Sequence, residues 1–299
     1  MKFLIIGSKG QLGSELVREC KRNDFSFLAL DLPEFNITDT SQVEKTLADF
    51  KPSIVINASA YTNVDKAETE PEIAFSVNSD GPANLAVSCD KNRIPVIHIS
   101  TDYVFDGSKG QPYAESDPVS PLGVYGKSKE QGDSKVRSIL KQHIILRTSW
   151  LYGAYGNNFV KIMLRLGIEN EIIKVVSDQY GCPTCAADLA EAVVDISKQI
   201  IQSSKIAWGT YHYCGSGITT WHKFAKAIFE IASQYQNYKV SSVEAITTAQ
   251  YPTRTKRPAF SALDCGLIKK HFGINTKPWQ GSLEKTIERI LKDSDRITG

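Results

Sequence analysis

Residues 7–13 read GSKGQLG, and this stretch decides the fold. It follows directly on the apolar run Phe3–Ile6 and leads into helically spaced apolar residues between Leu12 and Cys20. The spacing G-x-x-G-x-x-G between a strand and a helix permits a tight turn, in which backbone N–H groups can approach a pyrophosphate at the helix N-terminus. A dinucleotide-binding turn is therefore predicted, and a strand–helix turn without a ligand is the alternative.

The first half of the chain alternates short apolar runs with longer stretches of helical spacing. Strands are predicted at Phe3–Ile6, Phe25–Leu30, Ile54–Ile56, Val96–Ile99 and Ile144–Leu146. Runs this continuous are typical of strands that are buried on both faces, as in a parallel sheet. The order of elements predicts an α/β protein with a Rossmann-like, doubly wound parallel sheet.

The regular alternation fades after about Trp150. Helices are predicted there at residues 157–166, 186–201 and 220–235, and strands at 172–176 and 211–214. We expect residues 1–150 to form an NAD(P)-binding Rossmann-like domain, to which segments between about 177 and 215 return. Residues 151–299 are expected to form mainly a smaller C-terminal α/β domain that binds the substrate.

The composition excludes several classes of protein. The 299 residues include 35 Lys and Arg against 33 Asp and Glu, a net charge of +2 without a basic stripe, so nucleic acid is not an expected partner. No run approaches the roughly 18 apolar residues that a transmembrane helix needs. The apolar N-terminus is too short for a secretion signal, so we expect a cytoplasmic protein without a membrane partner.

Cysteines and histidines give no clear metal or redox motif. The six cysteines of this long chain are expected to be free thiols. Cys182 and Cys185 form a C-x-x-C pair, but no second pair accompanies it, as zinc sites of this type require. The five histidines lack ligand spacing, and we expect them to be structural.

Asp31 ends the second predicted strand, 18 residues after the last glycine of the turn. A carboxylate at that place can accept hydrogen bonds from an adenosine ribose 2′-hydroxyl, which favours NADH. Lys9 lies in the glycine turn and could offset the negative charge, which would admit NADPH. NADH and NADPH therefore both remain possible cofactors. The alternative is that Asp31 is an ordinary loop carboxylate without a ligand.

Tyr125 and Lys129 are spaced i and i+4, and Pro121 precedes a helix predicted to begin near Leu122. On a helix the two side chains share one face, where an ammonium would lower the pKa of the phenol and could also hold nicotinamide ribose hydroxyls. Thr101 ends the fourth strand, where ligands of such sheets bind, and could hydrogen-bond a substrate oxygen. The alternatives are an unrelated Tyr and Lys on a solvated helix, and a Thr that merely caps a strand.

The glycine turn, the strand-end Thr and the Y-x-x-x-K pair together resemble the extended short-chain dehydrogenase/reductase superfamily. Finer motifs closely resemble the dTDP-4-dehydrorhamnose reductase family and span nearly the whole chain. They are GQLG at 10–13, NASAYTNVDKAE at 57–68, STDYVFDG at 100–107, RTSW at 147–150, GNNF at 156–159, DQYG at 178–181, YPT at 251–253 and RP at 257–258.

The resemblance implies reduction of the 4-keto group of dTDP-4-dehydro-6-deoxy-L-mannose to dTDP-L-rhamnose, the last step in making a sugar donor for lipopolysaccharide O-antigen or cell-wall polysaccharide. It implies a catalytic set of Thr101, Tyr125 and Lys129. It implies NADPH or NADH contacts at Gly7, Gly10, Gln11, Leu12, Gly13, Asp31, Asn36, Ile37, Ser59, Ala60, Tyr61, Tyr125 and Lys129. It implies contacts with the dTDP-sugar at Thr62, Val64, Asp65, Thr101, Tyr103, Tyr125 and Trp150.

The chain departs from the family's pattern in one place. Asn36-Ile37 stands where the family often has Asp-Ile or Asp-Leu near the adenine, and Asn can still donate and accept hydrogen bonds, so we expect a small effect on cofactor affinity. Some members bind Mg²⁺ through glutamates at a homodimer interface. Glu15 is the one matching position, and a single surface glutamate is expected to be solvated, so no metal ligands are assigned and Mg²⁺ stays possible without clear ligands. A homodimer stays open.

Several residues allow two interpretations. Trp150 could be core or could stack on a sugar or base. Asn157 and Asn158 could cap a helix or reach a diphosphate, and Arg254 and Arg257 could be surface charges or reach phosphates.

Two other functions compete. One is a nucleotide-sugar epimerase or dehydratase, although a dehydratase would usually carry Asp-Glu after the Thr, where this chain has Asp102-Tyr103. The other is a regulatory subunit similar to that of methionine adenosyltransferase, which the presence of Thr101, Tyr125 and Lys129 together disfavours.

Overall fold

A six-stranded parallel sheet forms the centre of the protein in the computed structural model, which describes residues 1–298, with side chains as far as Lys292. The strands lie in the order β10-β5-β4-β3-β1-β2. Their bounds are β1 Lys2–Ile6, β2 Ser26–Leu30, β3 Ile54–Asn57, β4 Val96–Thr101, β5 His143–Thr148 and β10 Gly209–His212. The five strands predicted in the first half are thus present, each within two residues of its predicted ends, and the doubly wound α/β fold is confirmed.

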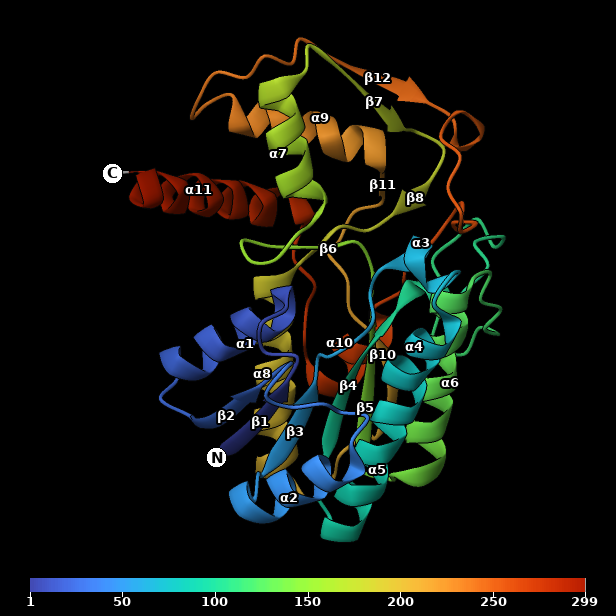
Figure 1. Ribbon diagram of the computed structural model, residues 1–299, viewed down its shortest axis with the longest axis vertical. Helices are drawn as coiled ribbons and strands as arrows, with labels where there is room; N and C mark the ends of the chain where they lie inside the picture. Colours follow the sequence, from blue (N-terminus) through green and yellow to red (C-terminus); the bar gives the residue numbers. More distant parts are fainter. Residues whose placement is uncertain (299) are drawn as a thin grey trace.

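Helices cover both faces of the sheet (Figure 1). On one face, α1 (Gln11–Arg22), α8 (Ala186–Gln202) and α10 (Gly266–Phe272) pack on alternate strand residues such as Ile5 and Ile56. On the other face, α2 (Thr40–Phe50), α5 (Gly81–Asn92) and α6 (Val124–Ile139) pack on the intervening residues, such as Leu4 and Val55. The strands are apolar at consecutive positions because both of their faces are buried.

The second half of the chain completes this layer. Strand β10 pairs in parallel with β5, Gly209 opposite Ile144, and forms one edge of the sheet. Helix α8 lies against α1, and Leu189 and Val193 join the same apolar cluster as Leu12 and Leu16.

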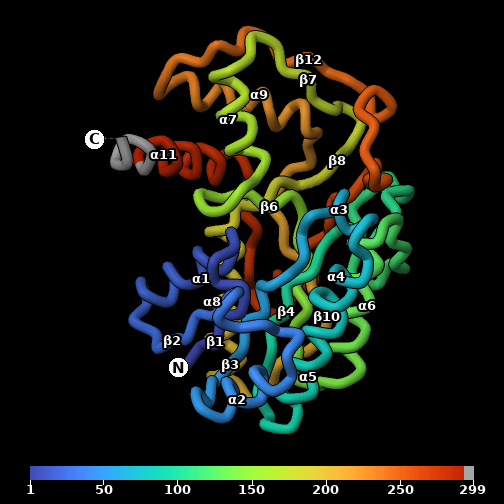
Figure 2. The backbone as a smooth tube through the Cα atoms, viewed as in Figure 1, coloured from blue at the N-terminus to red at the C-terminus, as the bar shows by residue number. Residues whose placement is uncertain are grey.

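A second lobe lies at the other end of the molecule (Figure 2). It contains α7 (Phe159–Glu169), α9 (Trp221–Ala232), α11 (Trp279–Thr298) and the parallel pair β7 (Ile172–Val176) and β12 (Ser242–Ile246). These elements enclose an apolar cluster of their own, which includes Phe224 and Leu283. The predicted helices and the strand at 172–176 are present, whereas β12 and α11 are additions that the sequence did not predict.

Short elements join the two lobes and flank the sheet edge. They are β6 (Leu151–Tyr152) with β9 (Thr184–Cys185), β8 (Tyr180–Gly181) with β11 (Thr219–Thr220), α3 (Val64–Ala67), α4 (Pro71–Phe75), the π-helical turn η1 (Ser76–Asp80), and the 3₁₀ turns η2 (Asp102–Val104) and η3 (Thr248–Gln250). Within residues 1–298, no helix is both long and apolar enough to cross a membrane.

Candidate active site

A cavity of about 780 Å³ opens at the carboxyl ends of β1 to β5, between the sheet and the second lobe. This is the edge at which open α/β sheets bind ligands. Sixteen of the residues that the sequence singles out line it: Gly7, Gly10, Gln11, Leu12, Asp31, Asn36, Ile37, Ser59, Ala60, Thr62, Val64, Thr101, Tyr103, Tyr125, Lys129 and Trp150. The structure therefore brings the proposed catalytic, cofactor and substrate residues to one place.

Three of the expected site residues do not line the cavity. Gly13 packs beneath the turn, where a Cβ would lie 2.0 Å from the carbonyl oxygen of Gly7. Tyr61 turns its hydroxyl to Glu70, to which it donates a 2.7 Å hydrogen bond. Asp65 forms an ion pair with Arg257, with 3.1 Å between the Oδ2 and NH2 atoms.

The glycine turn fits a bound pyrophosphate. Gly7 has a φ of +82°, and a Cβ at this position would lie 2.6 Å from the backbone nitrogen of Ser59, so a side chain is excluded. Gly10 is the N-cap of α1 and carries no side-chain cap, and Gly10, Gln11 and Leu12 of this first turn line the cavity. An anion at this helix N-terminus would satisfy them.

Asp31 lines the cavity directly after the carboxyl end of β2, where we expect the adenosine of the cofactor. Its Oδ2 accepts a 2.8 Å hydrogen bond from the backbone N–H of Lys9, and its Oδ1 accepts one from the N–H of Leu32. The Lys9 ammonium turns to Glu34, 2.8 Å away, and to the carbonyl of Leu32. Asn36 also lines this end, and its side-chain oxygen accepts two hydrogen bonds from Thr38.

Helix α6 carries Tyr125 and Lys129 to the cavity. Its N-cap, Gly123, has no side chain, and the Glu68 carboxylate accepts the Val124 N–H at 2.8 Å instead, which suits a helix N-terminus. Gly126 lets the helix approach η2, because a Cβ there would lie 2.2 Å from the carbonyl oxygen of Tyr103. The ring centroids of Tyr103 and Tyr125 are 5.5 Å apart.

The electrostatics of the Tyr–Lys pair differ from the sequence prediction. Lys129 is 2 % exposed and donates a 2.7 Å hydrogen bond to the carbonyl of Ile99. Burial lowers its pKa to about 8, while the charge on Asp133 raises it. Burial also raises the pKa of Tyr125, and a hydrogen bond with Thr101 opposes that rise. The expected lowering of the Tyr125 pKa is therefore wrong, because burial outweighs the other influences on this phenol.

Thr101 ends β4 beside a buried carboxylate. Its hydroxyl donates to the Oδ1 of Asp102 over 3.1 Å and accepts the backbone N–H of Tyr103 at 3.2 Å. Burial raises the pKa of Asp102 to about 6, and hydrogen bonds from Ser261 and Thr101 act against that rise. Asp102 also lines the cavity, and sequence reasoning did not assign it to the site.

Two tryptophans form the wall on the side of the second lobe. Trp150 stacks on Trp221 with ring centroids 3.6 Å apart and an interplanar angle of 9°. Trp150 has a φ of +47°, a strained backbone conformation for a large side chain. Sequence reasoning missed Trp221, the first residue of α9. The other apolar residues on that face of the helix, such as Phe224 and Ile228, indicate only a buried core.

Arg257 reaches the cavity from a long connection in the second half. It lines the cavity together with Tyr103 and pairs with Asp65. Thr255 fixes the same connection, since its N–H and hydroxyl donate to Asp65 and to the carbonyl of Val64. Arg254 is exposed.

Three further expectations can be compared with the structure. Glu15 is not solvated: it is 1 % exposed and pairs with Arg18 and Arg289, because α1 packs near α11. All six cysteines are free. Among the residues that the structure describes, His, Cys, Asp and Glu side chains form no group of three that could bind a metal ion.

The relation between the glycine turn and the Tyr–Lys pair defines the class of protein. Both open onto one cavity at the carboxyl edge of a doubly wound sheet, as in the short-chain dehydrogenases/reductases. The family model of the RmlD substrate binding domain matches residues 1–292. The chain belongs to this family.

Named relatives agree with this assignment. A dTDP-4-dehydrorhamnose reductase from Aggregatibacter actinomycetemcomitans is 45% identical over 285 residues, which cover 95% of this chain and 97% of that protein. A crystal structure of a dTDP-4-dehydrorhamnose reductase from Clostridium acetobutylicum is 37% identical, with a TM-score of 0.91 over 97% of this chain and 100% of that one. The dTDP-4-dehydrorhamnose reductase from Bacillus anthracis, solved in complex with NADP, is 35% identical, with a TM-score of 0.89 over 96% and 98% of the two chains.

Proposed function

We propose that this protein reduces the 4-keto group of dTDP-4-dehydro-6-deoxy-L-mannose to give dTDP-L-rhamnose, with NADPH or NADH as the reductant. One observation carries the proposal: Thr101, Tyr125 and Lys129 line the same cavity as the glycine turn. The names of the relatives, including one solved with NADP, support this substrate and this cofactor class.

A reduced nicotinamide, when bound, supplies the hydride that reaches C4 of the sugar. Tyr125 donates its phenolic proton to the carbonyl oxygen, which becomes the C4 hydroxyl. Burial keeps Tyr125 protonated at neutral pH, as a proton donor must be. The Lys129 ammonium stabilises the phenolate that remains, and the phenolate regains its proton from solvent.

In this scheme Thr101 donates a hydrogen bond to the sugar carbonyl during the reaction. Its hydroxyl donates to Asp102 in the structure, so it must turn this donation toward the sugar carbonyl as negative charge develops there. Preorganised donors of this kind are worth ~3–4 kcal/mol each in transition-state stabilisation.

The remaining site residues divide between cofactor and sugar nucleotide. In our proposal, Gly7, Gly10, Gln11, Leu12, Ser59 and Ala60 hold the dinucleotide, with Gly13 supporting the glycine turn from below. Thr62, Val64, Tyr103 and Trp150 contact the dTDP-sugar. The lobe that contains the sheet, residues 1–150 with α8, β10 and α10, then binds the cofactor and part of the sugar nucleotide, and the second lobe completes the sugar-nucleotide site.

The decisive experiment supplies dTDP-4-dehydro-L-rhamnose with NADPH or NADH. We expect stoichiometric oxidation of the reduced cofactor, followed at 340 nm, and a product whose NMR couplings are those of dTDP-L-rhamnose. Cofactor oxidation without the sugar is the control. A product with the opposite C4 configuration would overturn the assigned stereochemistry, and no oxidation at all would overturn the proposal.

The same experiment separates the competing functions. An epimerase or dehydratase retains and recycles its dinucleotide, so it would purify with bound nucleotide and consume no added NADPH. A regulatory subunit would show no turnover and would instead co-purify with a synthetase subunit. The presence of Thr101, Tyr125 and Lys129 in one cavity disfavours a purely regulatory role.

A further inference from the structure

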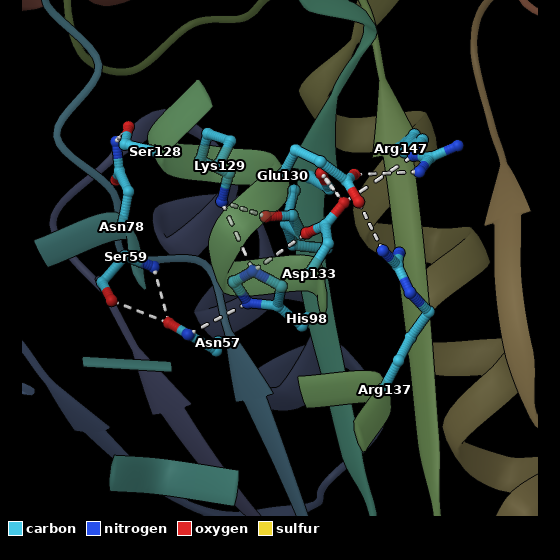
Figure 3. Close-up of polar contacts among 12 residues, drawn as sticks. Asn57, Ser59, Asn78, His98, Ser128, Lys129, Glu130, Asp133, Arg137 and Arg147 are labelled. Atoms are coloured by element: carbon cyan, nitrogen blue, oxygen red, sulfur yellow. Dashed lines mark hydrogen bonds and ion pairs between the residues drawn. The ribbon is translucent and has the colours of Figure 1, made fainter. Parts of the chain in front are cut away.

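A chain of polar side chains leads from the cavity wall into the protein interior beside Lys129 (Figure 3). It runs from Ser59 through Asn57 and His98 to Asp133. His98, Asn57 and Asp133 are all fully buried, and they come from β4, β3 and α6. Buried polar groups are costly unless each has a partner, so this arrangement calls for an explanation.

The proton on His98 can be assigned from its neighbours. The side-chain oxygen of Asn57 accepts the backbone N–H of Ser59 at 3.1 Å, which fixes the orientation of the amide. The Asn57 amide nitrogen, a donor, therefore faces the Nδ1 of His98 at 3.1 Å. Nδ1 must accept, so the proton of the neutral ring is on Nε2.

The Nε2–H of His98 points between Lys129 and Asp133. Its nitrogen is 3.5 Å from the Lys129 Nζ and 3.5 Å from the Oδ1 of Asp133. Both neighbours are positioned by their own hydrogen bonds: Lys129 to the carbonyl of Ile99 at 2.7 Å, and Asp133 from the hydroxyl of Ser100 at 2.6 Å. Of these two neighbours only the carboxylate can accept from an N–H group, so the ring faces Asp133 at 3.5 Å and takes no proton from the Lys129 ammonium.

We infer that Asp133 is a positioning residue: it is a buried counter-ion of Lys129, oriented by Ser100, with the neutral His98 ring 3.5 Å from both the carboxylate and the ammonium. The inference rests on the proposed function in that Lys129 belongs to the catalytic set. An ammonium removed from water needs an opposite charge nearby to stay protonated. Asp133 lies one helical turn along α6 from Lys129 and is not among the cavity-lining residues, and its charge raises the pKa of Lys129. The cation at direct ion-pair distance from Asp133 is Arg147, 3.7 Å away.

Other charged and titratable groups face this pair from the neighbouring elements. On β5, Arg147 lies 3.7 Å from Asp133 and 3.2 Å from Glu130, and Arg137 of α6 also pairs with Glu130 (Figure 3). Burial raises the pKa of Asp133 above its usual value, and the charges of Lys129 and Arg147 and the hydrogen bond from Ser100 act against that rise. The remaining groups are His143 of β5, Tyr125 of α6, and Asp102 and Tyr103 of η2.

The first test measures the charge on Lys129 without any turnover. The lysine side chains are labelled with ¹³C and ¹⁵N, the Lys129 signal is assigned from its loss in Lys129→Met, and its pKa is read by NMR titration. Asp133→Asn should lower that pKa by about one pH unit, since one opposite charge is lost. Glu130→Gln is the matched control: it removes the adjacent carboxylate of the same helix, which pairs with Arg147 and Arg137, and should leave the Lys129 pKa unchanged.

The second test uses the pH profile of kcat/KM for the ketosugar. In Asp133→Asn the alkaline limb should move to lower pH together with the Lys129 pKa, and Glu130→Gln should keep the wild-type profile. A merely structural role would lower activity equally at all pH values. If the wild-type protein shows no turnover, the proposed function fails, while the NMR titration still decides the role of Asp133.

A third measurement covers the case in which Asp133→Asn does not fold. The ¹³Cγ shift of Asp133 in the wild-type protein reports its own protonation. We expect a carboxylate across pH 6 to 9. A protonated Asp133 at pH 7, or an unchanged Lys129 pKa in Asp133→Asn, would overturn the inference.

Discussion

Lys9 and Glu34 form an ion pair, 2.8 Å between Nζ and Oε2, next to the carboxylate of Asp31 that the Lys9 backbone holds. The ammonium that could meet a 2′-phosphate is therefore already engaged by a second carboxylate. Both side chains are more than half exposed, so the pair is weak and can open. Cofactor preference is expected to depend on this pair as much as on Asp31.

Replacing Glu34 by Gln should favour NADPH. The free Lys9 ammonium would attract the 2′-phosphate, and we expect the ratio of kcat/KM for NADPH over NADH to rise about two- to fivefold, the range for an exposed pair. Glu44→Gln removes another exposed carboxylate, which pairs with Lys91 and lines no part of the cavity. This control substitution should leave the ratio of kcat/KM for NADPH over NADH unchanged. An unchanged ratio in Glu34→Gln would show that the Lys9 ammonium does not bind the 2′-phosphate of NADPH.

Replacing Tyr125 by Phe removes the proposed proton donor while keeping the ring. We expect kcat to fall about a hundredfold or more, with NADPH affinity, measured by fluorescence titration, unchanged. Tyr235→Phe is the matched control, because Tyr235 is exposed and lies outside the cavity. Near-normal turnover of Tyr125→Phe would refute its role.

The stack of Trp150 on Trp221 should set the affinity for the sugar nucleotide. Trp221→Ala removes the support of Trp150, and stacking of this kind is worth about 0.5–1.5 kcal/mol, so KM for the ketosugar should rise about three- to tenfold. Gly181→Ala should act in the same direction, because its Cβ would lie 2.4 Å from the Trp150 ring. KM for NADPH is the internal control. Equal rises in both KM values would indicate a general disturbance instead.

Asp102 should make stability depend on pH. Its folded-state pKa is raised from 3.8 to about 6, so the folded protein disfavours the charged form, a cost of about 3 kcal/mol above pH 6 that disappears below pH 4. Asp102→Asn should therefore increase the free energy of unfolding at pH 8 by up to this amount, and by little at pH 4. Urea denaturation at both pH values measures the difference. Asp49→Asn, at an exposed site, should show no such dependence.

The sequence alone predicts those parts of the fold and site that depend on residues close together in the chain. Consecutive apolar residues identify the strands of the central sheet, and the spacing of Tyr125 and Lys129 identifies their common helical face. The stretch 71–92 shows the limit: its apolar spacing is helical, but the chain forms α4, a π-helical turn and α5 in succession. Val87 of α5 is apolar and yet 39 % exposed.

The contacts that complete the site join residues far apart in the chain. Asp65 and Arg257 are 192 residues apart, and Trp150 meets Trp221 across the lobe boundary. No periodicity encodes such pairs, because they depend on how the lobes pack. His98 illustrates the same point: a lone histidine in a strand gives no sign that Asn57 and Asp133 will lie on either side of it.

The place of β10 at the sheet edge has a consequence for synthesis. As the nascent chain leaves the ribosome, five strands emerge within the first 148 residues, but the partner of β5 and the cover of α1 arrive only with residues 186–212. Until then an unpaired strand edge and an apolar helix face are open to other chains. A fragment that stops after Trp150 should therefore aggregate, whereas a fragment that extends past His212 can close the layer.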